Sequence, residues 1–342
     1  MKALVTGVSG KVGRYLTGRL VEKGAEVLGM DAAGPGGMPP SFEVGDRVLP
    51  PLFPGERFEL LQCDLLDAAD VEEAVSSFKP DLIFHLAAQS SAARSFKDPA
   101  GTMRVNVMGT LNLLEAARRS GKARIVIAGS AEEYGKRGPA EMPLPENSPI
   151  EPVSPYAASK AAQNTLAMQY NRAFGLEIIA TRSFNHTGPG QTPVFVLPAF
   201  AKQCAEIKIG AREPVLRTGN LEVTRDFLDV RDVVEAYVML ADKGEPGATY
   251  NVCSGEGLAL SSALESLVAM TGREVTVETD PDLLRPADVP VLTGDNARLV
   301  EKCGWSAAIG KDKMLEDLFA WWEGSTAAAI AGGLTERGER NA

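Results

Sequence analysis

The sequence predicts an α/β protein, with a doubly wound parallel sheet and a second, smaller α+β lobe. Three observations support this fold class. Short apolar runs alternate with helical patterns through the first half of the chain, as in parallel sheets whose strands are connected by helices. A glycine-rich turn joins the first apolar run to the first helical pattern. The chain also has 342 residues, more than the roughly 250–300 at which one hydrophobic core stops growing.

The elements of the first lobe can be predicted in order from these patterns. Val12, Leu16 and Leu20 recur near one face of the first helix, which is the spacing of an amphipathic helix. Helices are expected at 12–23, 69–78, 100–120 and 156–174. Strands are expected at 2–5, 26–30, 58–63, 81–86, 124–128 and 177–182. Ligands of such a sheet bind beyond the carboxyl ends of its strands.

The alternation breaks after about Phe184, where the second lobe is expected to begin. A Gly/Pro turn at 186–191 precedes patterns for helices at 195–209, 233–242 and 261–271, and for strands at 225–230, 249–252 and 274–278. We therefore expect a dinucleotide-binding domain at 1–184 plus about 225–253, and a substrate domain at about 185–224 plus 254–323. The Gly- and Pro-rich segment 32–55 is expected to be a surface loop, and 324–342 a disordered tail.

Composition excludes several classes of function. The chain has 35 Lys and Arg against 45 Asp and Glu, a net charge of −10, which argues against a nucleic-acid partner. Its four cysteines form no CxxC pair and it has two histidines, so neither a disulfide framework nor a metal site is expected. A signal peptide and a long apolar span are absent, which predicts a cytoplasmic protein with no membrane partner.

The turn TGVSGKVG at 6–13 predicts a dinucleotide site. Gly7, Gly10 and Gly13 allow a tight turn, close approach of backbone amides to a pyrophosphate, and close helix–strand packing. Asp31 ends the second strand 18 residues after Gly13, where a carboxylate binds ribose hydroxyls and repels a 2′-phosphate. The sequence therefore predicts a Rossmann-type domain that binds NAD in preference to NADP, with Asp64 placed to reach the adenine.

A second group of residues indicates hydride-transfer chemistry. Tyr156 and Lys160 are four residues apart on one helical face, where we expect the ammonium to lower the pKa of the phenol. Ser130 ends the fifth strand of the predicted sheet. A serine hydroxyl, a phenol and an ammonium beside a dinucleotide form a site that can transfer hydride at a carbinol or carbonyl carbon.

These residues lie within motifs that resemble a known family. The motifs are TGVSGKVG (6–13), HLAAQ (85–89), RVNVMGT (104–110), GSAEEYG (129–135) and YAASK (156–160). In this order they resemble the extended short-chain dehydrogenase/reductase family, also called NAD-dependent epimerases and dehydratases. Later motifs are similar to those of GDP-4-keto-6-deoxymannose reductases and GDP-mannose 4,6-dehydratases, namely ATRSFNHTGPGQ (180–191), GNLEVTRDFLDVRDVVEAY (219–237), TYNVCSG (249–255) and LLRPADVPVLTGD (283–295).

The resemblance implies a role for each matching residue. Lys160 would hold the nicotinamide ribose, Tyr156 would protonate the substrate oxygen, and Ser130 would hydrogen-bond that oxygen. The implied cofactor contacts are Gly7, Gly10, Lys11, Val12, Gly13, Asp31, Asp64, Leu65, Leu86, Ala87, Ala88, Asn106, Tyr156, Lys160 and Phe184. The implied substrate contacts are Gln89, Asn185, Asn220, Arg225 and Arg285, of which the arginines would neutralise a nucleotide diphosphate.

The residues after Ser130 bear on which reaction is expected. A 4,6-dehydratase needs an acid–base pair besides the tyrosine, and in that branch the serine or threonine is typically followed by Asp-Glu or Ser-Glu. Here Ala131, which cannot transfer a proton, precedes Glu132, a possible catalytic acid or base. This favours reduction of the C4 ketone of GDP-4-keto-6-deoxy-D-mannose by NAD(P)H.

Three alternatives remain open at this point. The first is dehydration of GDP-mannose, and the second is an NAD-dependent 4-epimerase, because Ser130, Tyr156, Lys160 and Asp31 would serve either reaction. The third is a catalytically silent NAD-binding module, against which the presence of Tyr156 and Lys160 argues. The resemblance also implies a homodimer, formed by the helices at 100–120 and 156–174.

Overall fold

The computed structural model describes the chain except for residues 34–42, 45–46, 49–56, 122, 285–288 and 332–342. It confirms the predicted fold class, because the largest sheet has seven strands that are all parallel, in the order β12-β8-β7-β6-β1-β2-β5. These strands are β1 (Lys2–Thr6), β2 (Glu26–Asp31), β5 (Phe58–Gln62), β6 (Leu82–His85), β7 (Arg124–Ser130), β8 (Ile178–Ser183) and β12 (Thr249–Val252). The strand order reverses between β1 and β6, which is where ligands bind in doubly wound sheets.

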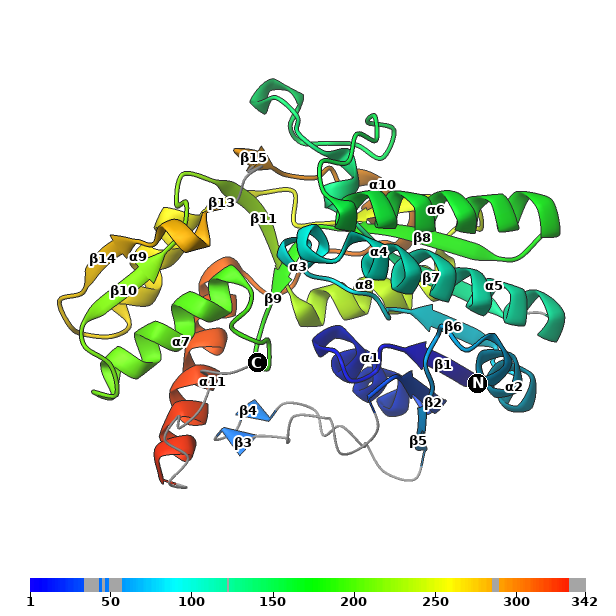
Figure 1. The fold of residues 1–342 in the computed structure, drawn as a ribbon, viewed down its shortest axis with the longest axis horizontal. Helices are drawn as coiled ribbons and strands as arrows, with labels where there is room; N and C mark the ends of the chain where they lie inside the picture. The colour runs from blue at the N-terminus through cyan, green and yellow to red at the C-terminus, as the bar shows by residue number, and fades with distance from the viewer. Residues whose placement is uncertain (34–42, 45–46, 49–56, 122, 285–288, 332–342) are drawn as a thin grey trace.

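Helices cover both faces of this sheet (Figure 1). On one face α1 (Lys11–Glu22), α8 (Val230–Lys243) and α10 (Ala297–Cys303) share a buried apolar cluster with β1 and β12. On the other face α2 (Ala68–Phe78), α5 (Gly109–Ser120) and α6 (Pro155–Phe174) share a second cluster with β6 and β7. The two clusters make the sheet a rigid platform for the residues at its carboxyl edge.

The expected helix at 100–120 is divided into three helical segments. It begins as α4 (Pro99–Met103), continues as the five-residue π-helix η2 (Arg104–Met108) and ends as α5, and it is preceded by α3 (Ala92–Lys97). A π-helix widens one turn, and such turns are frequent at functional sites. Asn106 lies in this π-helix and is fully buried.

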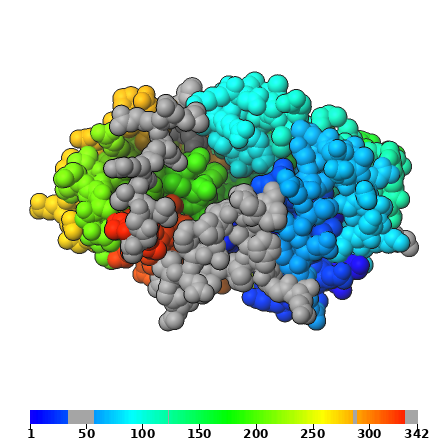
Figure 2. Space-filling model, turned by 60° about the horizontal axis from the view of Figure 1, so that its bottom comes forward, coloured from blue at the N-terminus to red at the C-terminus, as the bar shows by residue number. Residues whose placement is uncertain are grey.

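The second lobe has its own apolar core. Its elements are α7 (Val196–Lys208), β10 (Val215–Thr218), α9 (Leu260–Ala269), β14 (Thr276–Thr279) and α11 (Lys311–Ala331), and β10 pairs in parallel with β14. A small sheet joins β11 (Thr224–Asp229) to β9 (Asn185–Thr187), β13 (Gly257–Ala259) and β15 (Val291–Leu292). Three short 3₁₀ helices are η3 (Ala131–Tyr134), η4 (Pro139–Glu141) and η5 (Pro281–Leu283). In Figure 2 the part of the first lobe that is coloured blue to cyan and the red helix α11 of the second lobe lie on opposite sides of the molecule.

Three expectations about organisation are corrected by the structure. The strand expected at 225–230 is β11, but it lies outside the seven-stranded sheet. The segment at 297–305, expected in the substrate lobe, packs in the first lobe, because Leu299, Cys303 and Trp305 are buried in the cluster that contains α1 and α8. The tail expected to be disordered from Gly324 is helical as far as Ala331, because the alanine-rich stretch after Trp322 continues α11.

The Gly- and Pro-rich segment 32–55, expected to be a surface loop, contains two paired strands. These are β3 (Glu43–Val44) and β4 (Arg47–Val48), which pair antiparallel, while most of the rest of the segment lies outside the described residues. β3 lies beside α11 of the second lobe (Figure 1). Over the ranges that the structure describes, every helix is too short or too polar to span a membrane.

Candidate active site

The glycine turn between β1 and α1 has no room for a side chain at Gly7 or at Gly13. Gly7 has a φ of +72°, which residues with a side chain rarely adopt. A Cβ at Gly7 would lie 2.7 Å from the backbone nitrogen of Ala87, and a Cβ at Gly13 would lie 2.4 Å from the carbonyl oxygen of Gly7. A turn whose backbone stays this bare at the start of a helix fits the close approach of a pyrophosphate, so the residues present fit a dinucleotide cofactor.

Asp31 lies beside this turn at the end of β2. Its carboxylate accepts hydrogen bonds from the backbone nitrogens of Ser9, at 3.0 Å, and Ala33, at 3.1 Å. These bonds hold the carboxylate where the adenosine ribose lies in this type of fold. Asp64 follows β5, the next strand in the sheet, and is exposed; its carboxylate accepts a hydrogen bond from the amide of Leu66 at 2.9 Å.

Lys11 and Tyr15 connect the glycine turn to the segment that follows β8. The ammonium of Lys11 donates a hydrogen bond to the carbonyl oxygen of His186 at 3.0 Å. Burial lowers the pKa of Lys11 to about 7, against the opposing charge of Asp229. Tyr15, one turn further along α1, donates to the carbonyl oxygen of Pro189 at 3.3 Å. Side chains of α1 therefore hydrogen-bond the backbone at His186 and Pro189, where the second lobe is expected to begin.

Residues 86–88, predicted to contact the cofactor, follow β6 and approach the glycine turn. The backbone nitrogen of Gln89 then donates to Oδ1 of Asn106 at 2.7 Å, and Nδ2 of Asn106 donates to the Oγ of Ser159 at 2.8 Å. Ser159 in turn donates to the carbonyl oxygen of Tyr156 at 2.7 Å. This buried chain of hydrogen bonds fixes the start of α6 against the end of β6.

Leu65 and Phe184, two other predicted cofactor contacts, have buried side chains. A Cβ at Gly109 would lie 3.0 Å from the Cβ of Leu65, and a Cβ at Gly294 would lie 2.5 Å from the ring of Phe184. Both side chains fill the core, which leaves their backbone atoms as the groups that a cofactor can meet. Val12 is half-buried in the first turn of α1.

The structure brings the three predicted catalytic residues together at the carboxyl edge of β7. Ser130 ends that strand, and its hydroxyl shares a side-chain hydrogen bond with Tyr156 in the first turn of α6. The ammonium of Lys160, one turn further on, donates to the carbonyl oxygen of Ala128 at 2.8 Å and to Oε1 of Gln163 at 3.0 Å. Burial lowers the pKa of Lys160 to about 8.

The expectation that Lys160 lowers the pKa of Tyr156 is wrong. Burial raises the pKa of Tyr156, the charge of Glu132 raises it further, and the hydrogen bond with Ser130 opposes both. The physical reason is the direction of the ammonium of Lys160, which is bonded to Ala128 and its own helix. Tyr156 therefore keeps its proton at neutral pH, as a proton donor must.

Two glutamates follow Ser130, and only the first was identified from the sequence. Glu132 is half-buried, and its Oε2 accepts a hydrogen bond from the Oγ of Ser154 at 3.5 Å. Glu133 is buried and closes a capping box with Ser130. Sequence reasoning missed Glu133, although the Ser-x-x-Glu spacing of a capping box is the signal that identifies it.

The predicted substrate residues lie along the border of the second lobe. Asn185 is exposed at the start of β9, and Arg225 is half-buried on β11, the strand that pairs with β9. Asn220 is exposed in the turn before β11, where its side chain accepts a hydrogen bond from the amide of Glu222 at 2.9 Å. Arg285 lies outside the described residues.

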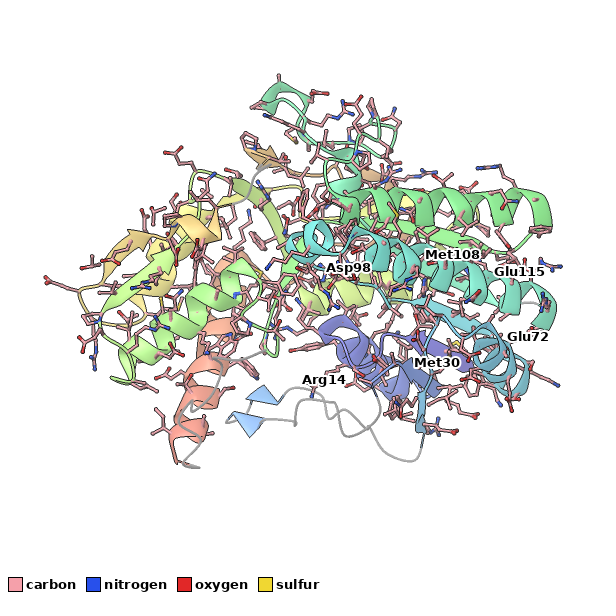
Figure 3. All side chains as sticks on the ribbon, viewed as in Figure 1. Arg14, Met30, Glu72, Asp98, Met108 and Glu115 are labelled. Carbon is pink, nitrogen blue, oxygen red and sulfur yellow. The ribbon has the colours of Figure 1, made fainter. Side chains whose placement is uncertain are left out.

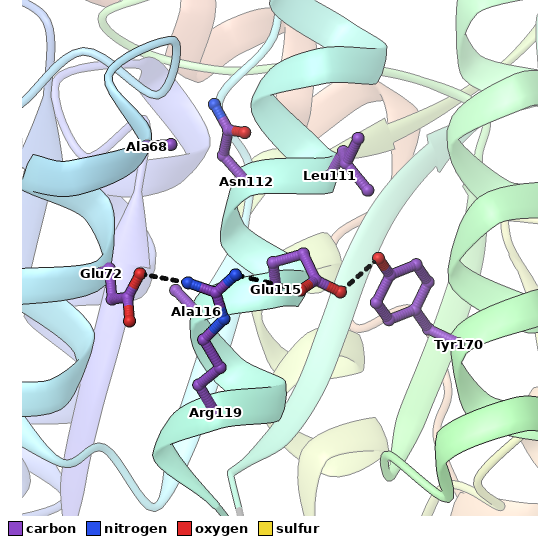
Figure 4. A pocket seen from close by; sticks show the side chains of 8 residues that line it. All are labelled: Ala68, Glu72, Leu111, Asn112, Glu115, Ala116, Arg119 and Tyr170. Carbon is purple, nitrogen blue, oxygen red and sulfur yellow. Dashed lines mark hydrogen bonds and ion pairs between the residues drawn. The ribbon is translucent and has the colours of Figure 1, made fainter.

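A separate hollow of about 370 Å³ lies between α2, α5 and α6 (Figure 4). Arg119 forms ion pairs with Glu72 and Glu115, and Tyr170 donates a hydrogen bond to Glu115 at 2.6 Å. Tyr170 is 14 residues beyond Tyr156 on α6, about 21 Å along the helix axis. The hollow is therefore distinct from the predicted active site.

In the described part of the chain, no group of three or more His, Cys, Asp or Glu side chains is placed to hold a metal ion.

The glycine turn after β1, with the serine, tyrosine and lysine gathered at the end of β7 on the other side of β6, defines an NAD(P)-dependent enzyme of the short-chain dehydrogenase/reductase type, in its epimerase/dehydratase branch. Comparison with known proteins narrows this class. The family profile described as GDP-mannose 4,6 dehydratase matches residues 4–318, and the chain belongs to that family.

Relatives and solved structures agree with this assignment. The GDP-6-deoxy-D-mannose reductase of Pseudomonas aeruginosa is 37% identical over 268 residues, which cover 78% of this chain and 86% of that protein. The structure of RMD from Pseudomonas aeruginosa complexed with NADPH aligns with a TM-score of 0.80 and 32% identity, over 95% of this chain and 99% of that one. The Thermus thermophilus UDP-glucose 4-epimerase in complex with NAD aligns with a TM-score of 0.82 and 29% identity, over 95% of this chain and 100% of that one. Proteins similar to this chain thus bind NAD or NADPH.

Proposed function

We propose that this protein reduces the C4 ketone of GDP-4-keto-6-deoxy-D-mannose with a nicotinamide cofactor. The observation that carries the proposal is the meeting of Ser130, Tyr156 and Lys160 at the end of β7, on the same edge of the sheet as the glycine turn that follows β1, with no proton-transferring side chain at Ala131. The similarity to a GDP-6-deoxy-D-mannose reductase supports the substrate.

Each residue has a defined task in this reaction. The backbone at Gly7 and Gly13 would receive the pyrophosphate, Asp31 would bind the adenosine ribose, and Lys160 would bind the nicotinamide ribose. When bound, the cofactor supplies the hydride that adds to C4. Tyr156 gives its proton to the C4 oxygen, so the ketone becomes an alcohol, and Ser130 donates a hydrogen bond to the same oxygen. Asn185, Asn220, Arg225 and Arg285 would bind the nucleotide sugar from the second lobe, with Gln89 facing it from the first.

Reduction fits the two glutamates of η3 better than dehydration does. Dehydration needs a base that removes the C5 proton and an acid that protonates the departing hydroxyl at C6. Glu133 is engaged in hydrogen bonds to Ser130, Asn164 and Arg182, which leaves it unavailable for either task. Glu132 alone remains near Tyr156.

Glu132 is also the observation that favours the second candidate, GDP-mannose 4,6-dehydratase. The negative charge of its half-buried carboxylate raises the pKa of Tyr156, and its Oε2 is bonded to Ser154, two residues before Tyr156, so it is the carboxylate that a dehydratase reaction would use as acid or base. A 4-epimerase of the kind found in the Thermus thermophilus structure would use the same serine, tyrosine and lysine.

We expect purified protein to oxidise NADH when it is given GDP-4-keto-6-deoxy-D-mannose, as measured by the loss of absorbance of the reduced cofactor. NADH should give a higher kcat/KM than NADPH, because the Asp31 carboxylate is fixed where a 2′-phosphate would have to lie. Dehydration of GDP-mannose without oxidation of NADH would assign the dehydratase activity instead. A higher kcat/KM with NADPH would overturn the cofactor preference alone.

A homodimer through α5 and α6 completes the proposed functional unit. Four large apolar side chains are exposed on the helical segments that precede α5 and on α6: Phe96 on α3 (50%), Met103 on α4 (37%), Met108 on η2 (46%) and Phe174 on α6 (51%). Met108 lies on the same helical run as Glu115 (Figure 3). Exposed apolar residues gathered on neighbouring helices are typical of a surface that another protein covers.

Met108→Asp should weaken this dimer about tenfold or more, because it replaces an exposed apolar side chain of the proposed interface with a charge. Light scattering after size-exclusion chromatography measures the mass over a range of concentrations. Val277→Asp is the matched control, because Val277 is 44% exposed on β14 of the second lobe. A wild-type protein that is monomeric at every concentration would contradict the proposal.

A further inference from the structure

Glu133 is the most completely bonded acidic side chain near the site. It is 1% exposed. Its Oε1 accepts hydrogen bonds from the backbone nitrogen of Ser130 at 2.9 Å and from Nδ2 of Asn164 at 2.8 Å. Its Oε2 accepts from the same amide at 2.9 Å and from Nε of Arg182 at 3.1 Å. One carboxylate therefore joins η3, β7, α6 and β8, the four elements that meet behind the predicted catalytic residues.

The backbone of β7 is shaped to receive this carboxylate. A Cβ at Gly129 would lie 2.7 Å from Oε1 of Glu133, 2.5 Å from Nδ2 of Asn164 and 2.1 Å from the carbonyl oxygen of Thr181. Gly129 directly precedes Ser130, so the carboxylate occupies the space that a side chain at that position would need. The contact therefore fixes the end of β7 at the residue that precedes Ser130.

We propose that Glu133 is a positioning residue of the hydride-transfer site: it fixes Ser130 through the backbone and holds a buried negative charge within electrostatic range of Tyr156 and Lys160. This inference rests on the proposed function, because Ser130, Tyr156 and Lys160 carry that reaction. Glu133 itself does not touch the reacting atoms, and its bonds to Asn164 and Arg182 keep it from exchanging a proton with them.

The charges around Glu133 determine the direction of its effect. The negative charge of Glu133 raises the pKa of Lys160 and that of Tyr156. Burial raises the pKa of Glu133 itself, and the charge of Arg182, with the hydrogen bonds from Ser130 and Asn164, opposes that rise. The titratable and charged groups that face this cluster are Glu132 and Tyr134 on η3, Arg182 on β8, Tyr156 and Lys160 on α6, Tyr237 on α8, and His85 on β6.

Glu133→Gln keeps the shape of the side chain and removes its charge. Both Lys160 and Tyr156 should then lose their protons at lower pH, so the alkaline limb of the kcat/KM profile for ketone reduction should move down by about 0.5–1 pH unit. The binding of NADH, followed by fluorescence between pH 6 and 10, should weaken at a correspondingly lower pH, because Lys160 holds the nicotinamide ribose. In the wild type this weakening is expected near the Lys160 pKa of about 8.

Asp232→Asn is the matched control. Asp232 is 4% exposed and accepts hydrogen bonds from the backbone nitrogens of Ala308 and Ile309, both at 3.0 Å, on the other face of the sheet. Asp232→Asn should lower the stability of the protein without moving the pH profile of kcat/KM or that of NADH binding. If Glu133→Gln does not fold, the double replacement Glu133→Gln with Arg182→Met removes both members of the buried pair, and a smaller downward shift is expected because the positive charge of Arg182 is lost as well.

The outcomes separate the two proposals. A shift in both Glu133 variants that is absent in Asp232→Asn supports the positioning role. Loss of stability with unmoved profiles would show that Glu133 only holds the fold, and would overturn the inference. If the wild type does not reduce the ketone, the proposed function fails, while the pH dependence of NADH binding still decides the role of Glu133.

Discussion

Tyr156→Phe should lower kcat for ketone reduction by about 10²–10⁴-fold, the usual effect of removing a positioned proton donor. The hydroxyl is the only group removed, and the side chain that carries it lies half-buried at the start of α6, with the hydroxyl hydrogen-bonded to Ser130. Burial keeps its proton in place at neutral pH. The dissociation constant of NADH should remain close to the wild-type value, because the glycine turn, Asp31 and Lys160 are untouched. Steady-state kinetics and fluorescence titration measure the two quantities separately.

Tyr170→Phe provides the control for this change on the same helix. Its hydroxyl donates a hydrogen bond to Glu115 at 2.6 Å in the hollow of Figure 4, about 21 Å along α6 from Tyr156. It should leave kcat unchanged. An equal loss of turnover and of NADH affinity in Tyr156→Phe would show that the tyrosine does not have the assigned role.

Gly13→Ala should remove NADH binding and destabilise the protein by about 1–3 kcal/mol, the usual cost of forcing an extra carbon into a packed region. The new Cβ would lie 2.4 Å from the carbonyl oxygen of Gly7 and 2.7 Å from the Cα of Val8. These are backbone atoms of the turn, so they can give way only if α1 moves away from β1. Urea unfolding measures the stability, and fluorescence titration measures the affinity.

Gly310→Ala is the control for that substitution. A Cβ at Gly310 meets nothing within 4 Å, and Gly310 precedes α11 in the second lobe. Its stability and NADH affinity should both match the wild type. If Gly13→Ala bound NADH as tightly as the wild type, the glycine turn would not be the pyrophosphate site.

The strands of the first lobe were predictable because each is a short apolar run bounded by polar residues. The run at 249–252 is β12 with the same limits, and the runs at 58–63 and 177–182 differ from β5 and β8 by no more than one residue at each end. Prediction was weaker in the second lobe. Its strands β10, β13 and β15 are only two to four residues long, too short for a periodic pattern, and they form through partners distant in sequence.

The catalytic residues could be predicted for a similar reason. Tyr156 and Lys160 are one helical turn apart, and Ser130 ends a recognisable strand, so local spacing and the rule for strand ends bring them together. Lys11 shows the limit of such reasoning. It belongs to the glycine turn in sequence, but its ammonium is bonded to the carbonyl oxygen of His186, 175 residues away.

The sequence by itself determined the fold class, the dinucleotide turn and the identity of the serine, tyrosine and lysine, because each depends on spacing within one or two neighbouring elements. Only the tertiary structure showed that Glu133 is bonded behind the site, that Tyr156 keeps its proton at neutral pH, and that α10 belongs to the first lobe. Each of these depends on burial and on partners far away in the chain. The charge of Glu133 is held by Asn164 and Arg182, 31 and 49 residues away, and the burial that raises the pKa of Tyr156 exists only once β7, α6 and α8 have packed together.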